Sequence, residues 1–236
     1  MKTLFPALLI LSVLPVSGAR PRSTSLIPPV PSFDATAFVT TVDNPYFPLR
    51  PGTIFVYTSR VGRAAEVDSM IVTRKTRNIL GVAAVVVHDR TYRGGELVEA
   101  TTDWYAQDKA GNVWYLGEDT KEYRQGKVVS AAGSWEAGEA GAHAGIIMPA
   151  APKIGVAYRQ EDRAGSAEDM GRVLSLTAAV AVPFGTFDHC LETEDWSPLE
   201  PGVLEHKYYA RGVGCVLQET VKGGNERMEL VKVIAP

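Results

Sequence analysis

The chain has 236 residues, 45% of them apolar, which is enough to bury a sizeable core in one or two domains. Its 24 lysines and arginines against 27 aspartates and glutamates leave a formal charge of −3, which disfavours binding to bulk DNA or RNA. With 22 glycines and 15 prolines the chain is rich in turns, yet it lacks the composition of a disordered protein.

The first residues have the pattern of a secretory signal peptide. Lys2 provides a short positive region, an apolar stretch covers residues 4–16, and small residues occupy positions 17–19. We expect a signal peptide over residues 1–19, cleaved after Ala19, and a soluble mature protein in the periplasm or outside the cell. A membrane anchor needs about 20 continuous apolar residues, and this stretch is shorter. We therefore expect no stable membrane insertion.

Residues 20–33 combine basic residues, Ser and Thr with four prolines, a composition typical of extended chain. We expect a flexible tether there. No Pro-, Gly- or Ser-rich linker divides the rest of the chain, so residues 34–236 are expected to form one domain.

Runs rich in Val, Thr, Tyr and Trp alternate with Gly, Pro, Asp or Asn about every 8 to 12 residues, which is typical of an antiparallel all-β domain. Only residues 33–40 and 166–173 favour helices, and both would be short. The predicted strands are Ile54–Ser59, Ser69–Arg77, Val82–Tyr92, Leu97–Gln107, Asn112–Gly117, Lys127–Ser130, Ala157–Glu161, Arg172–Thr177, Phe187–Trp196, Val203–Ala210, Cys215–Val221 and Arg227–Val233.

One hairpin is predicted to carry aromatic pairs. Asp108 and Gly111 suit the first and fourth positions of a type I turn, which puts Gln107 opposite Asn112. Tyr105 would then face Trp114, and Trp104 would face Tyr115. Such pairs stabilise a sheet, and one of them could also form the wall of a ligand cavity.

An acidic run follows this hairpin. Glu118, Asp119 and Glu122 lie within five residues, and calcium favours several oxygen ligands from one flexible loop. The run lacks the spacing of an EF-hand, and Lys121 would repel a cation. A calcium site and an exposed acidic turn are the two interpretations.

The longest stretch without strand character is 131–152, which contains Trp135, His143 and Met148. Long loops in compact domains are usually functional or mobile. We expect either a flap over the sheet or an irregular connection whose Trp135 and Met148 plug its end.

The last three long strands are predicted to form a meander. If residues 197–202 close its first hairpin symmetrically, Cys190 faces Tyr209 and Glu192 faces Lys207; the second hairpin puts Tyr209 opposite Cys215. Side chains alternate between faces, so a slip of one residue would exchange the faces. The expected inner face carries Leu191, Thr193, Leu204, His206, Tyr208, Val216, Gln218 and Thr220, and the outer face carries Cys190, Glu192, Glu194, Glu205, Lys207, Tyr209 and Glu219.

Cys190 and Cys215 are the two cysteines. Two cysteines in an exported chain suggest a disulfide. The predicted register opposes it, since it separates them by two strand spacings, about 9.5 Å, whereas a disulfide needs Cα atoms within about 7 Å. Both outcomes stay open.

Several segments resemble a group of exported bacterial proteins: 43–49 (DNPYFPL) with 51–53 (PGT), 103–108 (DWYAQD) with 111–115 (GNVWY), 118–120, 145–150 (GIIMPA), and 205–210 (EHKYYA) with 212–214 (GVG). More loosely, Pro183–Phe187 and the last hairpin are similar to envelope proteins built on a strongly curved antiparallel sheet, as in lipoprotein carriers. The resemblance implies a mainly β, half-barrel or barrel domain with a concave apolar face. It supplies no reaction and no catalytic residue.

The predicted function is the binding of a small apolar or amphipathic molecule on the concave face. The predicted contacts are Trp104, Tyr115, Trp135, Met148, His206 and Tyr208. No G-x-S-x-G motif occurs and the four histidines stand alone, so no enzyme class is identified and no cofactor is expected beyond possible calcium. The alternatives are a hydrolase using carboxylates and His206, and a structural envelope protein with a filled core.

Overall fold

The structure is a computed structural model that describes residues 27–61 and 64–236. The predicted signal peptide, its cleavage site and residues 20–26 of the predicted tether lie outside the described residues. The described chain is built almost entirely from antiparallel strands, with one 3-10 turn, η1 (Ala35–Ala37), before them. This confirms the predicted mainly β fold. Within the described residues, no helix has the length and apolar character needed to cross a membrane.

The strands in the first half of the chain are β1 Phe38–Val39, β2 Ile54–Val61, β3 Ala64–Ile79, β4 Val82–Arg93, β5 Glu96–Asp108, β6 Val113–Arg124, β7 Lys127–Ser130 and β8 Trp135–Glu136. The consecutive antiparallel pairs β3–β4, β4–β5 and β5–β6 form long hairpins.

The strands of the second half complete the sheet. Their bounds are β9 His143–Met148, β10 Ala157–Arg159, β11 Glu161–Asp162, β12 Met170–Val182, β13 Gly185–Trp196, β14 Leu204–Ala210, β15 Gly214–Lys222 and β16 Arg227–Ile234. Every predicted strand overlaps an observed one.

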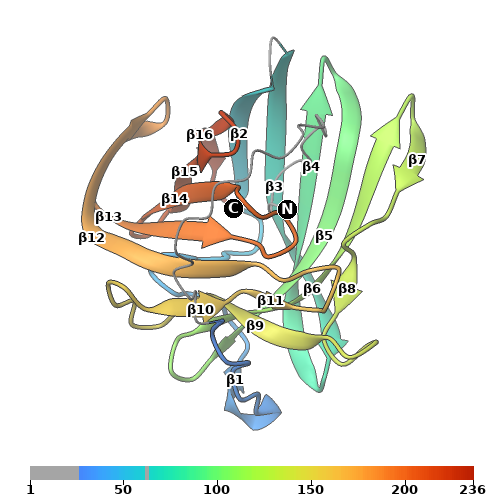
Figure 1. The fold of residues 1–236 in the computed structure, drawn as a ribbon, viewed down its shortest axis with the longest axis vertical. Coiled ribbons are helices and arrows are strands. Elements are labelled where there is room, and N and C mark those ends of the chain that lie inside the picture. The colour runs from blue at the N-terminus through green and yellow to red at the C-terminus, as the bar shows by residue number, and fades with distance from the viewer. Residues whose placement is uncertain (1–26, 62–63) are drawn as a thin grey trace, which may run out of the picture.

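The strands pair in the order β10-β12-β13-β14-β15-β16-β2-β3-β4-β5-β6-β9-β11, and the short strands β1, β7 and β8 pair outside this path. The sheet curves so strongly that its two edge strands come together. Figure 1 shows β12 and β13 on one side of the molecule and β5 and β6 on the other, with long hairpins extending from one end. The result is a nearly closed barrel.

The barrel closes through a single stretch of chain. β10 pairs with β12 at one edge of the sheet, and β11 pairs with β9 at the other edge. Gln160 alone separates β10 from β11, so one continuous segment bonds to both edges. Gly145 of β9 lies against the Gln160 backbone, and a Cβ built on this glycine would be 2.1 Å from the Gln160 carbonyl oxygen.

Tight turns account for the long hairpins. Leu80 and Gly81, between β3 and β4, both have positive φ, at 50° and 82°. Positive φ at both central residues is the type I′ geometry, whose twist matches that of paired strands. A turn of two residues therefore allows β3 and β4 to pair along most of their length.

Two predictions of local structure were wrong. Residues 166–173 form no helix, because β12 begins at Met170 and pairs with β13. The stretch 131–152 is not a strandless flap: it contains β8 and β9, both of which pair with β6. Its glycines and alanines obscured the strands, whose ladder partners lie far away in sequence.

The aromatic hairpin is shifted by one residue from its predicted register. The predicted turn is present, since the Gly111 amide donates to the Asp108 carbonyl at 2.9 Å. Gly111 then adopts φ of 97° and adds a bulge residue on one side. Tyr105 consequently pairs with Tyr115 rather than with Trp114.

The meander is also shifted by one residue, and this reverses the predicted faces of β14. Its first connection includes Val203, so Leu191 pairs with Tyr209 and Thr193 pairs with Lys207. Leu191, Thr193 and Val216 are buried as predicted, but Lys207 and Tyr209 also face inward. The predicted inward direction of His206 and Tyr208, and the predicted outward direction of Lys207, were wrong.

Cys190 and Cys215 are both free thiols. Cys190 lies on β13 and Cys215 on β15, and β14 runs between these strands, with Tyr209 opposite Cys215. The separation by two strand spacings keeps them beyond disulfide range. The disulfide alternative is therefore not realised in the structure.

Candidate functional site

The buried side chains of the protein are strongly acidic. Among the described residues, nine carboxylate side chains are buried but only one lysine, Lys207. Buried charges are normally paired, so an excess of this size is unusual. The inner face therefore carries buried polar groups in addition to the apolar surface that the resemblance implied. The buried acids are Glu66, Asp68, Asp89, Asp103, Asp108, Glu118, Glu161, Asp195 and Glu205.

A cavity lies inside the barrel between the strands β2–β5 and β14–β15. About 540 Å³ of it is free of protein atoms, part of this open to solvent, and about 40 Å³ can be reached by the centre of a water molecule. One water needs roughly 10–15 Å³ of such space, so the cavity has room for a few waters or a small chemical group. The lining residues are Phe47, Pro48, Leu49, Phe55, Tyr57, Met70, Asp89, Asp103, Tyr105, Lys207, Tyr209, Val213, Gly214 and Cys215.

The apolar part of the lining comes partly from the loop before β2. The backbone amide of Asn44 donates to Gln107 Oε1 at 2.8 Å, and Asn44 Nδ2 donates to the Gly111 carbonyl at 2.8 Å. These bonds fix the loop on the β5–β6 hairpin. Phe47 is thereby held edge-on to Tyr105, with ring centroids 5.2 Å apart.

The polar part of the lining comes from alternate residues of the strands. Asp103 and Tyr105 are two apart on β5, so both point inward. Tyr115 of β6 stacks on Tyr105 at 4.7 Å and donates its hydroxyl to Asp103 Oδ1 at 2.6 Å. The Tyr105 hydroxyl is buried without a hydrogen-bond partner. This leaves one polar group of the lining unsatisfied.

Burial raises the pKa values of the carboxyl groups near the cavity. Burial raises the pKa of Asp68 to about 6. Burial, and then the charge of Asp68, raises the pKa of Asp89 well above its usual range. Burial, followed by the charges of Glu118 and Asp89, does the same to the pKa of Asp103. Burial therefore favours the protonated, neutral forms of Asp89 and Asp103 over their charged forms.

Lys207 is already paired. Its Nζ lies 2.9 Å from Asp195 Oδ2. Asp195 also accepts from Gln160 Nε2 at 3.1 Å and from Thr193 Oγ1 at 2.7 Å. Burial alone would lower the pKa of Lys207, but Asp195 and Glu205 raise it above its usual range. The amine stays charged, so it is not a nucleophile.

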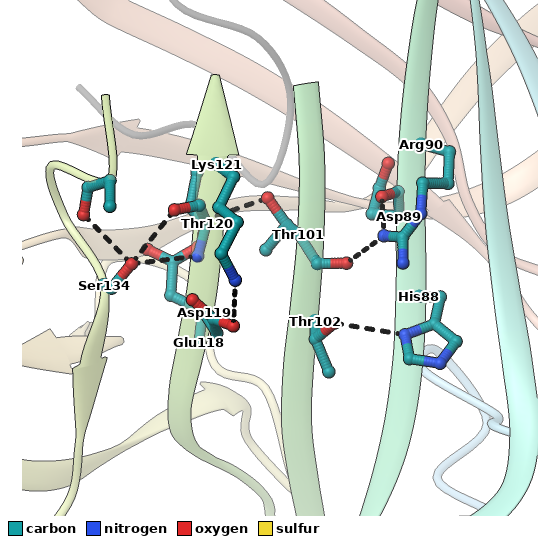
Figure 2. A network of polar contacts seen from close by, with 11 residues as sticks. His88, Asp89, Arg90, Thr101, Thr102, Glu118, Asp119, Thr120, Lys121 and Ser134 are labelled. Atoms are coloured by element: carbon teal, nitrogen blue, oxygen red, sulfur yellow. Dashed lines mark hydrogen bonds and ion pairs between the residues drawn. The ribbon is translucent and has the colours of Figure 1, made fainter. Parts of the chain in front are cut away.

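Hydroxyl groups connect the strands of the wall that carries Asp89 and Asp103. The hydroxyls of Thr101 and Thr120 lie 3.0 Å apart, and Thr120 donates to Glu118 Oε2 at 2.7 Å. Figure 2 shows this arrangement on neighbouring strands, with Ser134 bonded to Thr120 from the adjoining segment. These side-chain bonds add to the ladder bonds and fix the spacing of the wall.

None of the six predicted contact residues lines the cavity. Tyr115 and Trp135 do come together, edge-on at 5.4 Å, but behind Tyr105. Met148 is part of the buried core. Trp104 alternates with Tyr105 and so faces away from the cavity, where the Arg77 guanidinium lies 4.4 Å from its ring.

His206 and Tyr208, the other two predicted contacts, belong to an outer polar cluster. His206 Nδ1 lies 3.1 Å from Glu192 Oε1. Tyr208 donates to Glu192 and to Glu219, at 3.2 and 3.3 Å. His206 therefore has a carboxylate partner but does not face the cavity, as a hydrolase would need.

The three acids of the predicted calcium site do not converge. Glu118 is buried, whereas Asp119 points to the other face of β6 and pairs with Lys121 at 2.5 Å. Glu122 lies farther along β6, opposite Glu99. Within the part of the chain that the structure describes, no group of three or more His, Cys, Asp or Glu residues is arranged to hold a metal ion.

The polar lining of the cavity, including Asp89, Asp103 and Tyr105, was not predicted from the sequence. A signal was present: Asp89 and Thr91, Asp103 and Tyr105, and Lys207 and Tyr209 each alternate at a spacing of two. Polar residues at every second position of a strand share one face, and that face is predicted to be exposed when the other face is taken as the core. The strands here bury side chains on both faces in places, as Trp104 and Tyr105 show.

No known family model matches the chain, and no curated protein matches it. Among solved structures, one from Parabacteroides distasonis ATCC 8503 named "putative lipoprotein" is similar over 80% of this chain and 98% of that chain. The TM-score is 0.44 and the sequence identity is 14%. At these values the similarity carries no conclusion about ligand or activity.

Proposed function

We propose that this protein is an exported binding protein that holds a small amphipathic molecule in the barrel cavity. The expectation of export rests on the signal-peptide pattern of residues 1–19. The observation that carries the binding proposal is the mixed lining, which joins an apolar surface to buried polar groups. Small-molecule sites typically combine these two features.

The two parts of the lining suit the two parts of such a ligand. Phe47, Leu49, Phe55 and Met70 offer apolar contacts for a short hydrocarbon segment. The Tyr105 hydroxyl offers an unsatisfied hydrogen-bonding group for the polar end. A buried group of this kind costs about 1–3 kcal/mol while it has no partner, and a ligand would supply one.

The cavity is tested by titration with three six-carbon probes: 1-hexanol, 1-hexylamine and hexanoate. We expect at least one probe to bind saturably in calorimetry and to shift the NMR signals of Met70 and Val213. Val213→Trp should fill the cavity and weaken that binding by about ten-fold or more, since the indole ring takes up the space that the ligand needs. Val221→Trp places the same ring at an exposed position and should leave binding unchanged.

The proposal would be overturned if none of the three probes binds at millimolar concentration. It would also be overturned if Val213→Trp and Val221→Trp bind the probes equally well. If a probe binds as expected, native mass spectrometry of protein from its own host should identify the natural ligand.

A further inference from the structure

The charges around the cavity are unbalanced. Among the described lining residues, the acids are Asp89 and Asp103 and the one cation is Lys207, whose ammonium pairs with Asp195. Arg90 follows Asp89 in β4, but its guanidinium donates to the backbone carbonyls of Asp89 and Thr101 at 2.6 and 2.7 Å. Both carboxyl groups of the lining therefore face the cavity without a cationic partner of their own.

Aromatic rings make up much of the remaining surface. Phe47 comes from the loop before β2, Phe55 and Tyr57 from β2, Tyr105 from β5 and Tyr209 from β14. Ring faces attract cations, and groups of such rings are used to recognise ammonium compounds. The unpartnered Tyr105 hydroxyl adds an oxygen that can accept a hydrogen bond from an N–H group.

We propose that the polar end of the ligand is a primary ammonium group, held between Asp103, Asp89 and the Tyr105 hydroxyl, with its hydrocarbon part against Phe47 and Phe55. This inference rests on the proposed binding function of the cavity. The cavity, which has room for only a few waters, suits an ammonium group and its first carbon atoms better than a bulky head group.

Binding of an ammonium group should also change the protonation of the two carboxyl groups. Burial raises the pKa values of both acids in the empty cavity because it disfavours their charged forms. A bound ammonium supplies the missing countercharge, so a carboxyl group loses its proton to solvent and becomes the partner of the ligand. The titratable and charged groups around these two acids are Tyr57, Asp68, Arg90, Glu99, Tyr105, Glu118, Tyr115, Lys207, Tyr209 and Cys215.

The three six-carbon probes separate this inference from the proposed function. We expect 1-hexylamine to bind about ten-fold more tightly than 1-hexanol at pH 7, since hydrogen bonds to charged groups exceed neutral ones by about this margin. Hexanoate should bind most weakly. Calorimetry in buffers of different ionisation enthalpy should show that about one proton is released with hexylamine and none with hexanol.

Two variants test the role of the carboxyl groups. Asp103→Asn keeps an acceptor for the Tyr115 hydroxyl but cannot ionise, so the ratio of hexylamine to hexanol affinity should fall about ten-fold or more. Asp89→Asn is the second variant, used where the first does not fold. Asp119→Asn, on the outer face, should leave the ratio unchanged.

The inference is overturned if hexanol or hexanoate binds as tightly as hexylamine, or if Asp103→Asn and Asp89→Asn leave the ratio unchanged. Saturable hexanol binding in those cases still supports the proposed function. Failure of all three probes overturns the proposed function itself.

Discussion

Lys207 and Asp195 are almost completely buried, with side-chain exposures of 6% and 5%. Gln160 and Thr193 donate to the same carboxylate, so the pair meets the demand that buried charges be fully hydrogen-bonded. The pair also ties β14 to β13 on the inner side of the barrel. This single contact explains why a lysine can occupy an interior position.

Replacing Lys207 by Met should destabilise the protein by about 3–5 kcal/mol, because Asp195 would remain buried without its cation. Lys121→Met is the matched control: it breaks a pair whose members are 41% and 46% exposed, and should cost less than about 1 kcal/mol. Urea denaturation of the two variants measures both values. Equal losses would show that the buried pair contributes no more than the exposed one.

Among the elements, the short strands β10 and β11 form the seam at which the barrel closes. β10 and β11 are short, and the chain at Gln160 must approach β9 closely enough to close the sheet. Gly145 permits this approach because it has no side chain. Its neighbour across the seam is the backbone of Gln160, which cannot move aside as a flexible side chain could.

Gly145→Ala should therefore open the seam and lower the free energy of unfolding by about 2 kcal/mol or more, through backbone displacement and lost ladder bonds. Gly185→Ala is the control, because its nearest neighbour to a new Cβ lies at an ordinary 3.6 Å. Hydrogen exchange should show faster exchange at β9 and β11 in the first variant and no change there in the second. Slow exchange at β9 and β11 in Gly145→Ala would contradict the assignment of the seam.

At the scale of the whole molecule, the acidic interior makes stability depend on pH. Burial raises the pKa of Glu205 from its usual 4.5 to about 8, despite the opposing effect of Lys207. The folded protein then holds a proton that the unfolded chain has released. Since the unfolded state binds fewer protons over this interval, stability falls as pH rises.

We expect the free energy of unfolding to decrease between about pH 4.5 and pH 8, by at most about 1.4 kcal/mol per pH unit for each such proton. Glu205→Gln keeps a neutral side chain that can still contact Gln218 and should reduce this slope. Glu139→Gln, at an exposed position, should not. Urea denaturation at several pH values measures the slopes, and stability that rises with pH over this range would refute the expectation.

Local patterns predicted much of the fold. The strand β4 could be recognised from its β-branched residues and from turn residues at both ends, and the turn at Asp108–Gly111 was predicted correctly. Pairing between strands was harder to predict, because one bulge at Gly111 or one extra residue at Val203 shifts every later pair. The shift at Val203 moved His206 and Tyr208 out of the predicted site and brought Lys207 into the barrel.

The amino-acid sequence by itself determined that this chain forms antiparallel strands, because β-branched and aromatic runs and turn residues act over a few positions. Which side chains face the interior was decided only by the tertiary structure, since a one-residue shift exchanges the two faces of a strand. The cavity depends on this choice, because its residues come from a loop and strands far apart in the chain. That Asp89 and Asp103 are buried in the cavity without a cationic partner among the described residues follows only from the closed barrel.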